Sequence, residues 1–369
     1  MPNFNQHDDI FLDYSKKVFV SHKNNKVTYF GILLSLIFIF TSITVVKAFY
    51  LRSKVNSYED IIVEIESKDS TDIVIENENV DDLILSKMSA ADKLVNCIAS
   101  SVTSDELPDN VLQIINNIKS YYDQSNDYFA FKYVDLYTGF SVQYNENQPI
   151  FAASSIKAPK DIYIYEMAAM GKIDLNEKLT YTSRYYNTGS GLLKNTEFNK
   201  EYSIKTLLEY STVHSDNAAH NMLMDRFGRE NILSFWKEKG TDTIFTQNNN
   251  WGSTSAHDAA IYMKELYRFY LENSQYGEAL MTNFINAYPS FILGKNNYKI
   301  ANKSGWSGSS LHDMSIIFAD NPYIVVGLSN LGDTNYYMSY FNKINDLAYQ
   351  LHTEYWKYKV ETCTNTKQY

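Results

Sequence analysis

Apolar and polar residues recur in a definite order along the last two-thirds of the chain. Helical spacing of apolar residues predicts a helix over 111–122 and a closing amphipathic helix over 336–358, with helices and loops over 154–290. Strand patterns occur at 128–137, 140–144, 298–303, 314–319 and 323–329. This order predicts an α+β domain over 107–369, with one antiparallel sheet flanked by helices and a mostly helical subdomain.

Residues 27–46 form a run of twenty residues without a charge. About 20 residues at a rise of 1.5 Å span the hydrocarbon core of a bilayer, so the run predicts an N-terminal transmembrane helix in contact with lipid. A buried helix of a soluble domain is one alternative. A cleaved signal peptide is the stronger one, because Val46-Lys47-Ala48 resembles a cleavage site. The length of the run and the 26 residues before it favour a signal-anchor instead.

The negative charge of the protein is concentrated in one segment. The formal net charge is -10, and residues 55–109 hold 14 acidic residues against three lysines, so the rest of the chain is close to neutral. We therefore expect a tail over 1–26, the membrane segment, an acidic stalk or small accessory module over 47–106, and the large domain over 107–369. A basic face of the kind that nucleic-acid binding requires is not apparent.

Cysteine and histidine give little sign of a metal site. Cys97 and Cys363 lie just before the large domain and near its end, and both a disulfide and two separate buried thiols fit this placement. The seven His are scattered, without paired spacing or Cys partners. We expect no metal and no cofactor.

A Ser-x-x-Lys motif occurs at Ser154-Ser155-Ile156-Lys157. In a helix that begins at Ser154, Lys157 would lie one turn later on the same face, with its amine near the hydroxyl. Such an amine can take the proton of the hydroxyl if burial lowers its pKa. The motif alone is weak, because Ser234-Phe235-Trp236-Lys237 has the same spacing and fits an ordinary helix surface.

Two further triplets follow in order. Ser215-Asp216-Asn217 lies between two predicted helices, where a simple helix cap would also explain it. Lys303-Ser304-Gly305 ends a predicted strand, where a simple exit into a turn would explain it as well. Taken together with Ser-x-x-Lys, at these spacings, the three motifs resemble the ordered signature of class A β-lactamases and penicillin-binding proteins, over about 107–358.

The resemblance implies a role for each matching residue. Ser154 would attack a carbonyl and become acylated, with Lys157 as the neighbouring base and Ser215 passing a proton to the leaving nitrogen. Lys303 and Ser304 would bind a substrate carboxylate and position Ser215. The other expected substrate contacts are Asn217, which would hold an amide side chain, Gly305, which would leave the strand edge bare, and the backbone amide of Trp306, which with that of Ser154 would form an oxyanion hole.

Two departures from the family pattern bear on function. The family's β-lactamases carry a Glu on the Ω-loop that activates the hydrolytic water, but the matching stretch here, 240–252, contains no Glu and is shorter. Asp242 fits a helix-ending turn and is not expected to act as a base. Trp306 is bulky where the family has a small residue. A missing general base slows hydrolysis by on the order of 10²–10⁴, so a penicillin adduct should persist.

These observations favour a membrane-anchored, penicillin-binding D-Ala-D-Ala peptidase that acts on the stem peptide of peptidoglycan. The alternatives are a β-lactamase that hydrolyses β-lactams, an acylated sensor or pseudoenzyme, and a hydrolase of an unrelated ester or amide. Basic residues flank the membrane segment almost equally, so charge does not decide its orientation. Access to the wall requires the catalytic domain to be extracellular, on a single-pass anchor in the cell membrane with 1–26 in the cytoplasm.

Overall fold

The structure is a computed structural model that describes residues 97, 99–100, 102, 106–124, 128–242, 244–245, 250–272, 274–292, 294–295, 297–331 and 335–365. The chain divides into two units, Met1–Val80 and Asp81–Tyr369, and the described residues all belong to the second. The predicted tail, the membrane segment 27–46 and nearly all of the stalk lie outside them. Within the described ranges, no helix is both long and apolar enough to cross a membrane.

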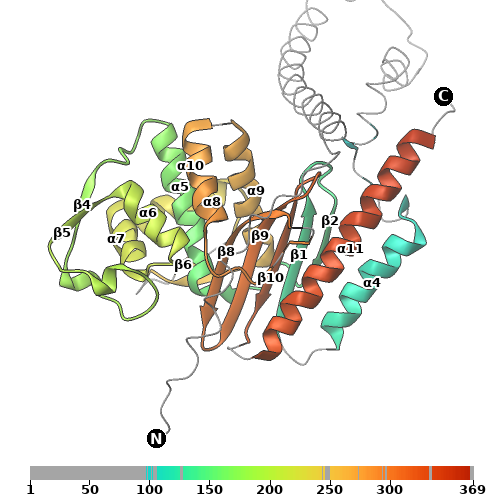
Figure 1. Ribbon diagram of the computed structural model, residues 1–369, viewed down its shortest axis with the longest axis horizontal. Helices are drawn as coiled ribbons and strands as arrows, with labels where there is room; N and C mark the ends of the chain where they lie inside the picture. The colour runs from blue at the N-terminus through green and yellow to red at the C-terminus, as the bar shows by residue number, and fades with distance from the viewer. Residues whose placement is uncertain are drawn as a thin grey trace, which may run out of the picture. The chain divides into compact units, whose positions relative to one another are not determined.

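A five-stranded antiparallel sheet forms the centre of the domain, in the order β2-β1-β10-β9-β8 (Figure 1). Its strands are β1 (Phe129–Asp135), β2 (Ser141–Tyr144), β8 (Lys299–Ser307), β9 (Ser310–Phe318) and β10 (Tyr323–Ser329). All five expected strands are therefore present. Since β1 pairs with β10, the first and last parts of the domain meet in the middle of the sheet.

The length of β8 differs from the prediction. The strand pairs with β9 without interruption from Lys299, opposite Phe318, to Ser307, opposite Ser310. Lys303-Ser304-Gly305 therefore lies inside a strand and not at its end. The expected exit at Gly305 was wrong because backbone pairing with β9 outweighs the weak strand preference of glycine.

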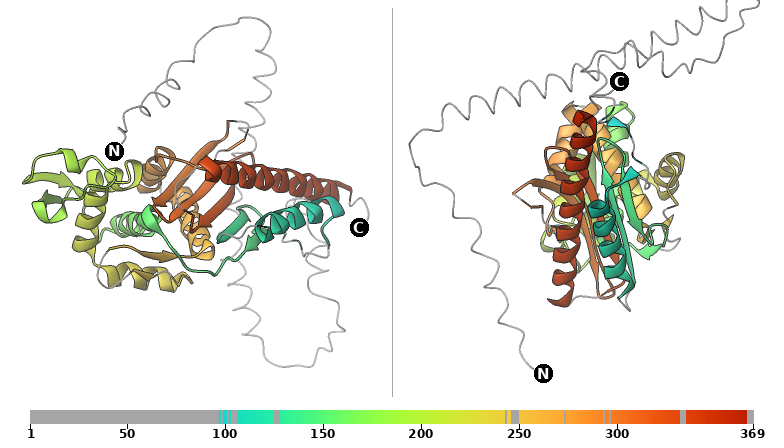
Figure 2. Two further views of the ribbon diagram at one scale, coloured as in Figure 1. Left: turned by 90° about the horizontal axis from the view of Figure 1, so that it is seen from below. Right: turned by 90° about the vertical axis from the view of Figure 1, so that its right-hand side faces the viewer.

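Helices cover both faces of the sheet, and alternate residues of the strands point into two separate cores. In β10, Ile324 and Val326 belong to one core, while Tyr323 and Val325 belong to the other. A strand that is buried on both faces reads as a continuous apolar run, because successive side chains point to opposite sides. On the second face, α4 (Asp109–Asp123) and α11 (Asn335–Asn365) lie side by side (Figure 2). Both helices were predicted, but their pairing was not.

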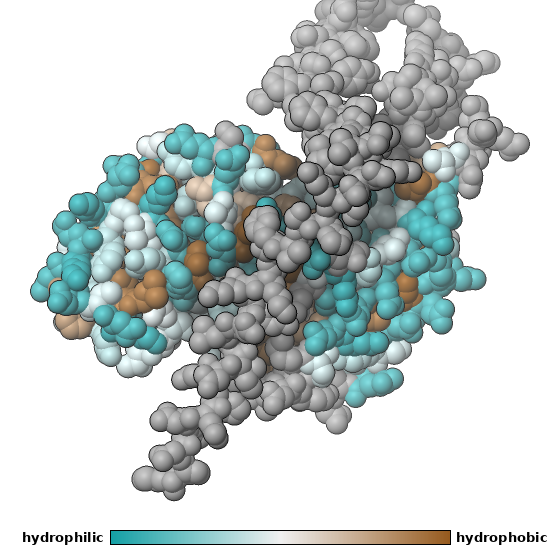
Figure 3. All heavy atoms as spheres, viewed as in Figure 1, coloured by the Kyte–Doolittle hydropathy of each residue, from teal (hydrophilic) through white to brown (hydrophobic). Residues whose placement is uncertain are grey.

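The first face carries the helices that lead to the mostly helical subdomain. The helices α9 (Ala256–Glu272) and α10 (Ser274–Ile285) contact the sheet, and α5 (Lys157–Ala169) packs against both of them. The helices α6 (Ile204–Val213), α7 (Asn217–Phe227) and α8 (Arg229–Glu238) pack against α5 (Figure 1). The visible surface of this subdomain is largely hydrophilic, with apolar residues in small groups (Figure 3). The architecture confirms the expected α+β class.

Short strands within 150–254 were not predicted. One small sheet has the order β3-β7-β6, from β3 (Ile150–Phe151), β7 (Gly252–Thr254) and β6 (Ile244–Phe245). A two-stranded sheet joins β4 (Lys178–Tyr181) to β5 (Lys200–Ser203). Strands of two to four residues carry too little periodicity to be separated from loops, because their pairing partners are distant in the sequence.

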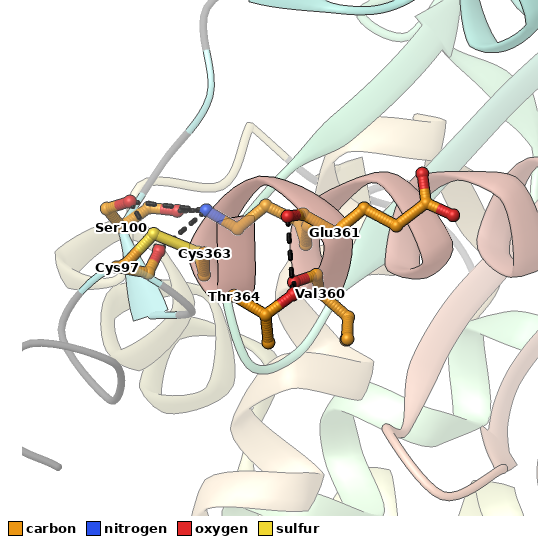
Figure 4. The surroundings of a disulfide bond; sticks show 7 residues. Cys97, Ser100, Val360, Glu361, Cys363 and Thr364 are labelled. Carbon is orange, nitrogen blue, oxygen red and sulfur yellow. Dashed lines mark hydrogen bonds between the residues drawn. A yellow bond between two sulfur atoms is a disulfide. The ribbon is translucent and has the colours of Figure 1, made fainter. Parts of the chain in front are cut away.

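The structure joins Cys97 and Cys363 in a disulfide, with Cα atoms 5.7 Å apart (Figure 4). The sequence alone left this pairing open. Beside it, Lys359 Nζ donates to the carbonyl oxygens of Cys97 and Ser100, at 2.8 and 2.9 Å. The end of α11 is therefore fastened to the segment that precedes the domain both covalently and by hydrogen bonds.

Candidate active site

Ser154 and Lys157 lie where a short 3₁₀ helix, η2 (Ala153–Ile156), passes directly into α5. The expected α-helix at Ser154 thus begins as a tighter turn and becomes α-helical at Lys157. Lys157 Nζ lies 3.2 Å from Ser154 Oγ, as the spacing predicted. Ala153 has a φ of 45°, in the left-handed region that non-glycine residues rarely adopt, and this places the serine at a sharp entry to the helix.

The turn between α6 and α7 brings a second serine to the same amine. Ser215 has a φ of 50°, and both its Oγ and its carbonyl oxygen accept hydrogen bonds from Lys157 Nζ, at 3.1 and 2.5 Å. Asn217 Oδ1 accepts another at 2.7 Å. Lys157 therefore has four oxygen atoms around its nitrogen, two from hydroxyl groups and two from carbonyl groups.

Asp216 holds this turn in place, as the cap that its position predicted. Its side chain accepts from the amide of Ala219 at 2.9 Å and so caps α7. It also accepts from the amides of Leu192 and Leu193, at 2.6 and 2.8 Å. These two hydrogen bonds fix the loop that contains Leu192 and Leu193 against the turn. A second contact joins the same two segments, because Asn217 Nδ2 donates to Asn187 Oδ1 at 3.1 Å.

The third motif approaches from β8. Lys303 Nζ donates to Ser215 Oγ at 3.2 Å and to the carbonyl oxygen of Ser304 at 3.0 Å. Ser215 therefore lies between two lysines. Lys303 and Ser304 are buried, with 1% and 5% of their surface exposed. Trp306, near the C-terminal end of β8, is 56% exposed.

Gly305 lets β8 approach the turn that carries Ser154. A Cβ atom at this position would lie 2.6 Å from the carbonyl oxygen of Ala152 and 2.8 Å from the amide nitrogen of Ser155, closer than real Cβ contacts. The expectation that Gly305 leaves the edge of the strand bare for substrate stays a prediction, while protein backbone fills the position that a Cβ atom would take. Glycine is needed here so that the strand and η2 can pack directly together.

Burial sets the electrostatics of the two lysines. Lys157 has no exposed surface, and its pKa is lowered well below the usual value by burial first, then by the positive charges of Lys303 and Lys160. Burial likewise lowers the pKa of Lys303, to about 8, although Asp313 and Asp161 counteract it. Removing an ammonium group from water favours its neutral form.

A buried polar network beneath Lys157 was missed by the sequence analysis. Lys160, one turn further along α5, forms an ion pair with Asp161 and donates to Ser211 Oγ at 3.1 Å. Asp161 also accepts from the hydroxyls of Ser211 and Thr212, both at 2.9 Å. The sequence did offer one signal of this network, because Lys160 and Asp161 are adjacent charged residues in a helix most of whose residues face the core. Charged side chains buried in a core need partners.

The second Ser-x-x-Lys motif has none of these surroundings. Ser234 and Lys237 lie on α8, and both are exposed to solvent. The structure thus separates two motifs of identical spacing by their burial.

The Ω-loop stretch reaches the site through Trp251, which the sequence analysis did not single out. Lys157 Nζ lies 5.3 Å from the centre of the Trp251 ring. Asp242 is exposed, and its amide donates to Asp258 Oδ1 at 3.2 Å, consistent with a turn at the end of α8. Residues 243 and 246–249 lie outside the described part. Among the described residues, no group of three or more His, Cys, Asp or Glu side chains is placed to hold a metal ion.

Comparison with known proteins agrees with this arrangement. The family model described as "Beta-lactamase enzyme family" matches residues 111–351. The chain is 30% identical to beta-lactamase BRO-1 of Moraxella catarrhalis over 199 residues, which cover 49% of this chain and 63% of that protein. The alignment thus spans less than two-thirds of the relative's length.

Solved structures with the same fold include β-lactamases and penicillin-binding proteins. The β-lactamase of Sphaerobacter thermophilus DSM 20745 superposes with a TM-score of 0.58 at 17% identity, covering 66% of this chain and 96% of that one. PBP-A superposes with a TM-score of 0.61 at 20% identity, with the same coverage of 66% and 96%. A PBP-A mutant, solved as an acyl-enzyme complex with penicillin G, gives a TM-score of 0.60 at 21% identity, covering 68% and 100%. The chain belongs to the beta-lactamase enzyme family, within the serine β-lactamase-like superfamily.

Proposed function

We propose that the protein is a serine acyl-enzyme with Ser154 as nucleophile, and that it acts as a penicillin-binding D-Ala-D-Ala peptidase on peptidoglycan. The observation that carries the proposal is the set of four oxygens around Lys157 Nζ. A neutral amine has two N–H groups and one lone pair. The carbonyl oxygens of Ser215 and Asn217 accept the two N–H groups, so the lone pair is left for a serine hydroxyl.

Acylation then follows from this geometry. Ser154 Oγ attacks the carbonyl carbon of the scissile amide, and its proton passes to Lys157 Nζ, 3.2 Å away. Ser215 Oγ lies within reach of both Lys157 and Lys303, so it can deliver its proton to the leaving nitrogen as the C–N bond breaks and regain one from Lys157 Nζ, which returns to its neutral form. The products are an ester on Ser154 and a free amine.

The position of β8 supports a peptide as substrate. The strand lies at the edge of the sheet and passes directly beside the Ser154 turn at Gly305. An edge strand offers unpaired backbone groups that an extended peptide can bind. In this proposal Lys303 and Ser304 bind the terminal carboxylate, Asn217 binds an amide of the substrate, and the backbone amides of Ser154 and Trp306 stabilise the oxyanion.

The stretch 240–252 favours the peptidase over the β-lactamase. Its only acidic residue is Asp242, which is exposed at the end of α8. Penicillin resembles the peptide terminus and should acylate Ser154, but its ester should hydrolyse slowly without a positioned carboxylate. The PBP-A mutant captured as an acyl-enzyme with penicillin G shows that the fold can hold such an adduct. The 30% identity to a β-lactamase keeps antibiotic hydrolysis as the second candidate function.

The uncharged run 27–46 supports membrane anchoring. Peptidoglycan lies beyond the membrane, so a wall peptidase must place its active site there. The Cys97–Cys363 disulfide is consistent with this location, because disulfides persist in oxidising surroundings.

Substitution of the nucleophile tests the proposed activity. Ser154→Ala should abolish covalent labelling by a fluorescent penicillin and release of D-alanine from a peptide that ends in D-Ala-D-Ala. The matched control Ser234→Ala changes the exposed serine of the second motif and should keep both. The label on the unmodified protein should persist for minutes or longer. Rapid penicillin turnover without an adduct would favour the β-lactamase, and absence of any labelling would point to a hydrolase of an unrelated substrate.

Lys303 should discriminate substrates by their carboxylate. A charge-assisted hydrogen bond contributes about 1.5–3 kcal/mol, so Lys303→Ala should slow acylation by a carboxylate substrate about 10- to 150-fold. An ester substrate without that carboxylate should be acylated at a rate that changes far less. Lys237→Ala, at an exposed position on α8, should change the rate with neither substrate.

The pH dependence gives a second test of Lys303. Because the ammonium of Lys303 loses its proton near pH 8, the preference for carboxylate substrates should decline as the pH rises through 8. Equal losses on both substrates at all pH values would instead assign Lys303 to proton transfer or folding.

Limited proteolysis of intact protoplasts tests the anchoring. Added protease should release or degrade the domain 107–369, because the proposal places it outside the cell. An epitope fused before residue 27 should stay protected until the cells are lysed. Protection of the large domain in intact protoplasts would contradict the proposed topology and the action on the wall.

A further inference from the structure

Trp251 occupies a fixed position between two elements of the active site. On one side, the carbonyl oxygen of Asn250 lies 2.9 Å from His220 Nε2, and Asn250 Nδ2 donates to Asn221 Oδ1 at 3.0 Å. His220 and Asn221 both belong to α7, the helix that starts directly after Ser215-Asp216. The backbone just before Trp251 is therefore fastened to the helix that also carries Asn217.

On the other side, the chain after Trp251 is paired with the strand that leads to the nucleophile. The carbonyl oxygen of Gly252 accepts from the amide of Ala152 at 2.9 Å, and Ser253 lies opposite Phe151 in the β3–β7 pair. Trp251 is thus held at both ends by segments that carry Ser154 and Asn217.

The side chain of Trp251 lies against the base. Its ring centre is 5.3 Å from Lys157 Nζ and 5.2 Å from the centre of the His220 ring. His220 is completely buried, and burial followed by the charges of Lys160 and Lys157 lowers its pKa well below the usual value. A neutral imidazole therefore supports the indole. Lys157 has hydroxyl and carbonyl oxygens on one side and an aromatic ring on another, and its side chain has no exposed surface.

We propose that Trp251 controls the lifetime of the acyl-enzyme by keeping water away from Lys157. The inference rests on the proposed acylation of Ser154. In deacylation, a water oxygen bonds to the acyl carbonyl carbon, the bond from that carbon to Ser154 Oγ breaks, one water proton passes to a base, and Ser154 Oγ regains a proton. The products are a carboxylic acid and free serine. Trp251 excludes the attacking water from Lys157, the amine that accepts the proton of Ser154 during acylation. The stretch 240–252 therefore lacks an activating Glu and, through Trp251, also covers the neighbouring base.

A graded series of variants tests this role. In the series Trp251→Phe, Trp251→Leu and Trp251→Ala, the side chain that covers Lys157 becomes smaller at each step. We expect the half-life of the penicillin adduct to fall in that order, about threefold in the Phe variant and at least tenfold in the Ala variant. The half-life is measured after complete labelling and removal of free penicillin, so a change in the acylation rate does not enter. Circular dichroism and the thermal midpoint show which variants are folded, and the conservative Phe variant decides the outcome if the smaller ones are not.

Tyr137→Ala is the matched control, because Tyr137 is a partly exposed aromatic residue in the turn between β1 and β2. Its adduct should decay at the rate of the unmodified protein. Half-lives that stay unchanged or lengthen across the Trp251 series, in folded variants, would overturn the inference and leave the proposed function intact. An unmodified protein that forms no adduct on Ser154 would overturn both.

Discussion

The active site depends on burying the amine of Lys157 among oxygen atoms, with no carboxylate of the described residues paired to it. Lys157, Lys160 and Lys303 are all almost completely inaccessible to solvent. Burying three ammonium groups together is unfavourable, both through lost hydration and through mutual repulsion. The protein meets this constraint unequally. Burial lowers the pKa of all three lysines. Lys160 pairs with Asp161, whereas the described contacts of Lys157 are with two hydroxyls, two carbonyl oxygens and an indole. Among the described residues no carboxylate pairs with Lys157, and its pKa is lowered well below the usual value, which favours the neutral form that a base requires.

The fold supplies this environment by bringing three separate segments to one point. Ala153 and Ser215 have left-handed backbone conformations, and each makes a sharp turn that leads into a helix. Gly305 lets the edge strand β8 pack against the first of these turns. Asp216 joins the second turn to a loop some 24 residues earlier. These strained or tightly packed positions persist because the two cores on either face of the sheet hold the elements that carry them. These contacts position the groups between which the proton moves, and the hydrogen bonds on either side of Trp251 hold it beside Lys157.

The sequence predicted those features that depend on local pattern. Five strands and the amphipathic helices α4 and α11 were expected from periodicity. The grouping of Ser154, Lys157, Ser215, Asn217 and Lys303 was implied by the resemblance of three ordered motifs to class A β-lactamases and penicillin-binding proteins. The features that depend on distant contacts could not be predicted. β8 runs past Gly305 because β9 pairs with it, and Gly305 proves to serve packing because Ala152 lies against it. Trp251 belongs to no motif, and its importance comes from the side chains that it contacts, for which an apolar residue has no local signal. Lys160 gave only the weak signal of a charge next to Asp161 on a core-facing helix.

The central claim is that Lys157 is held neutral beside Ser154 in the free protein. Nuclear magnetic resonance of the lysine ε-carbons, with Lys157 assigned by Lys157→Arg, measures its ionisation directly. The account predicts that Lys157 titrates well below the value of about 10.4 for an exposed lysine, and that the rate of acylation rises with the same pKa. A Lys157 amine that remains protonated across the whole pH range in which Ser154 is acylated would contradict it.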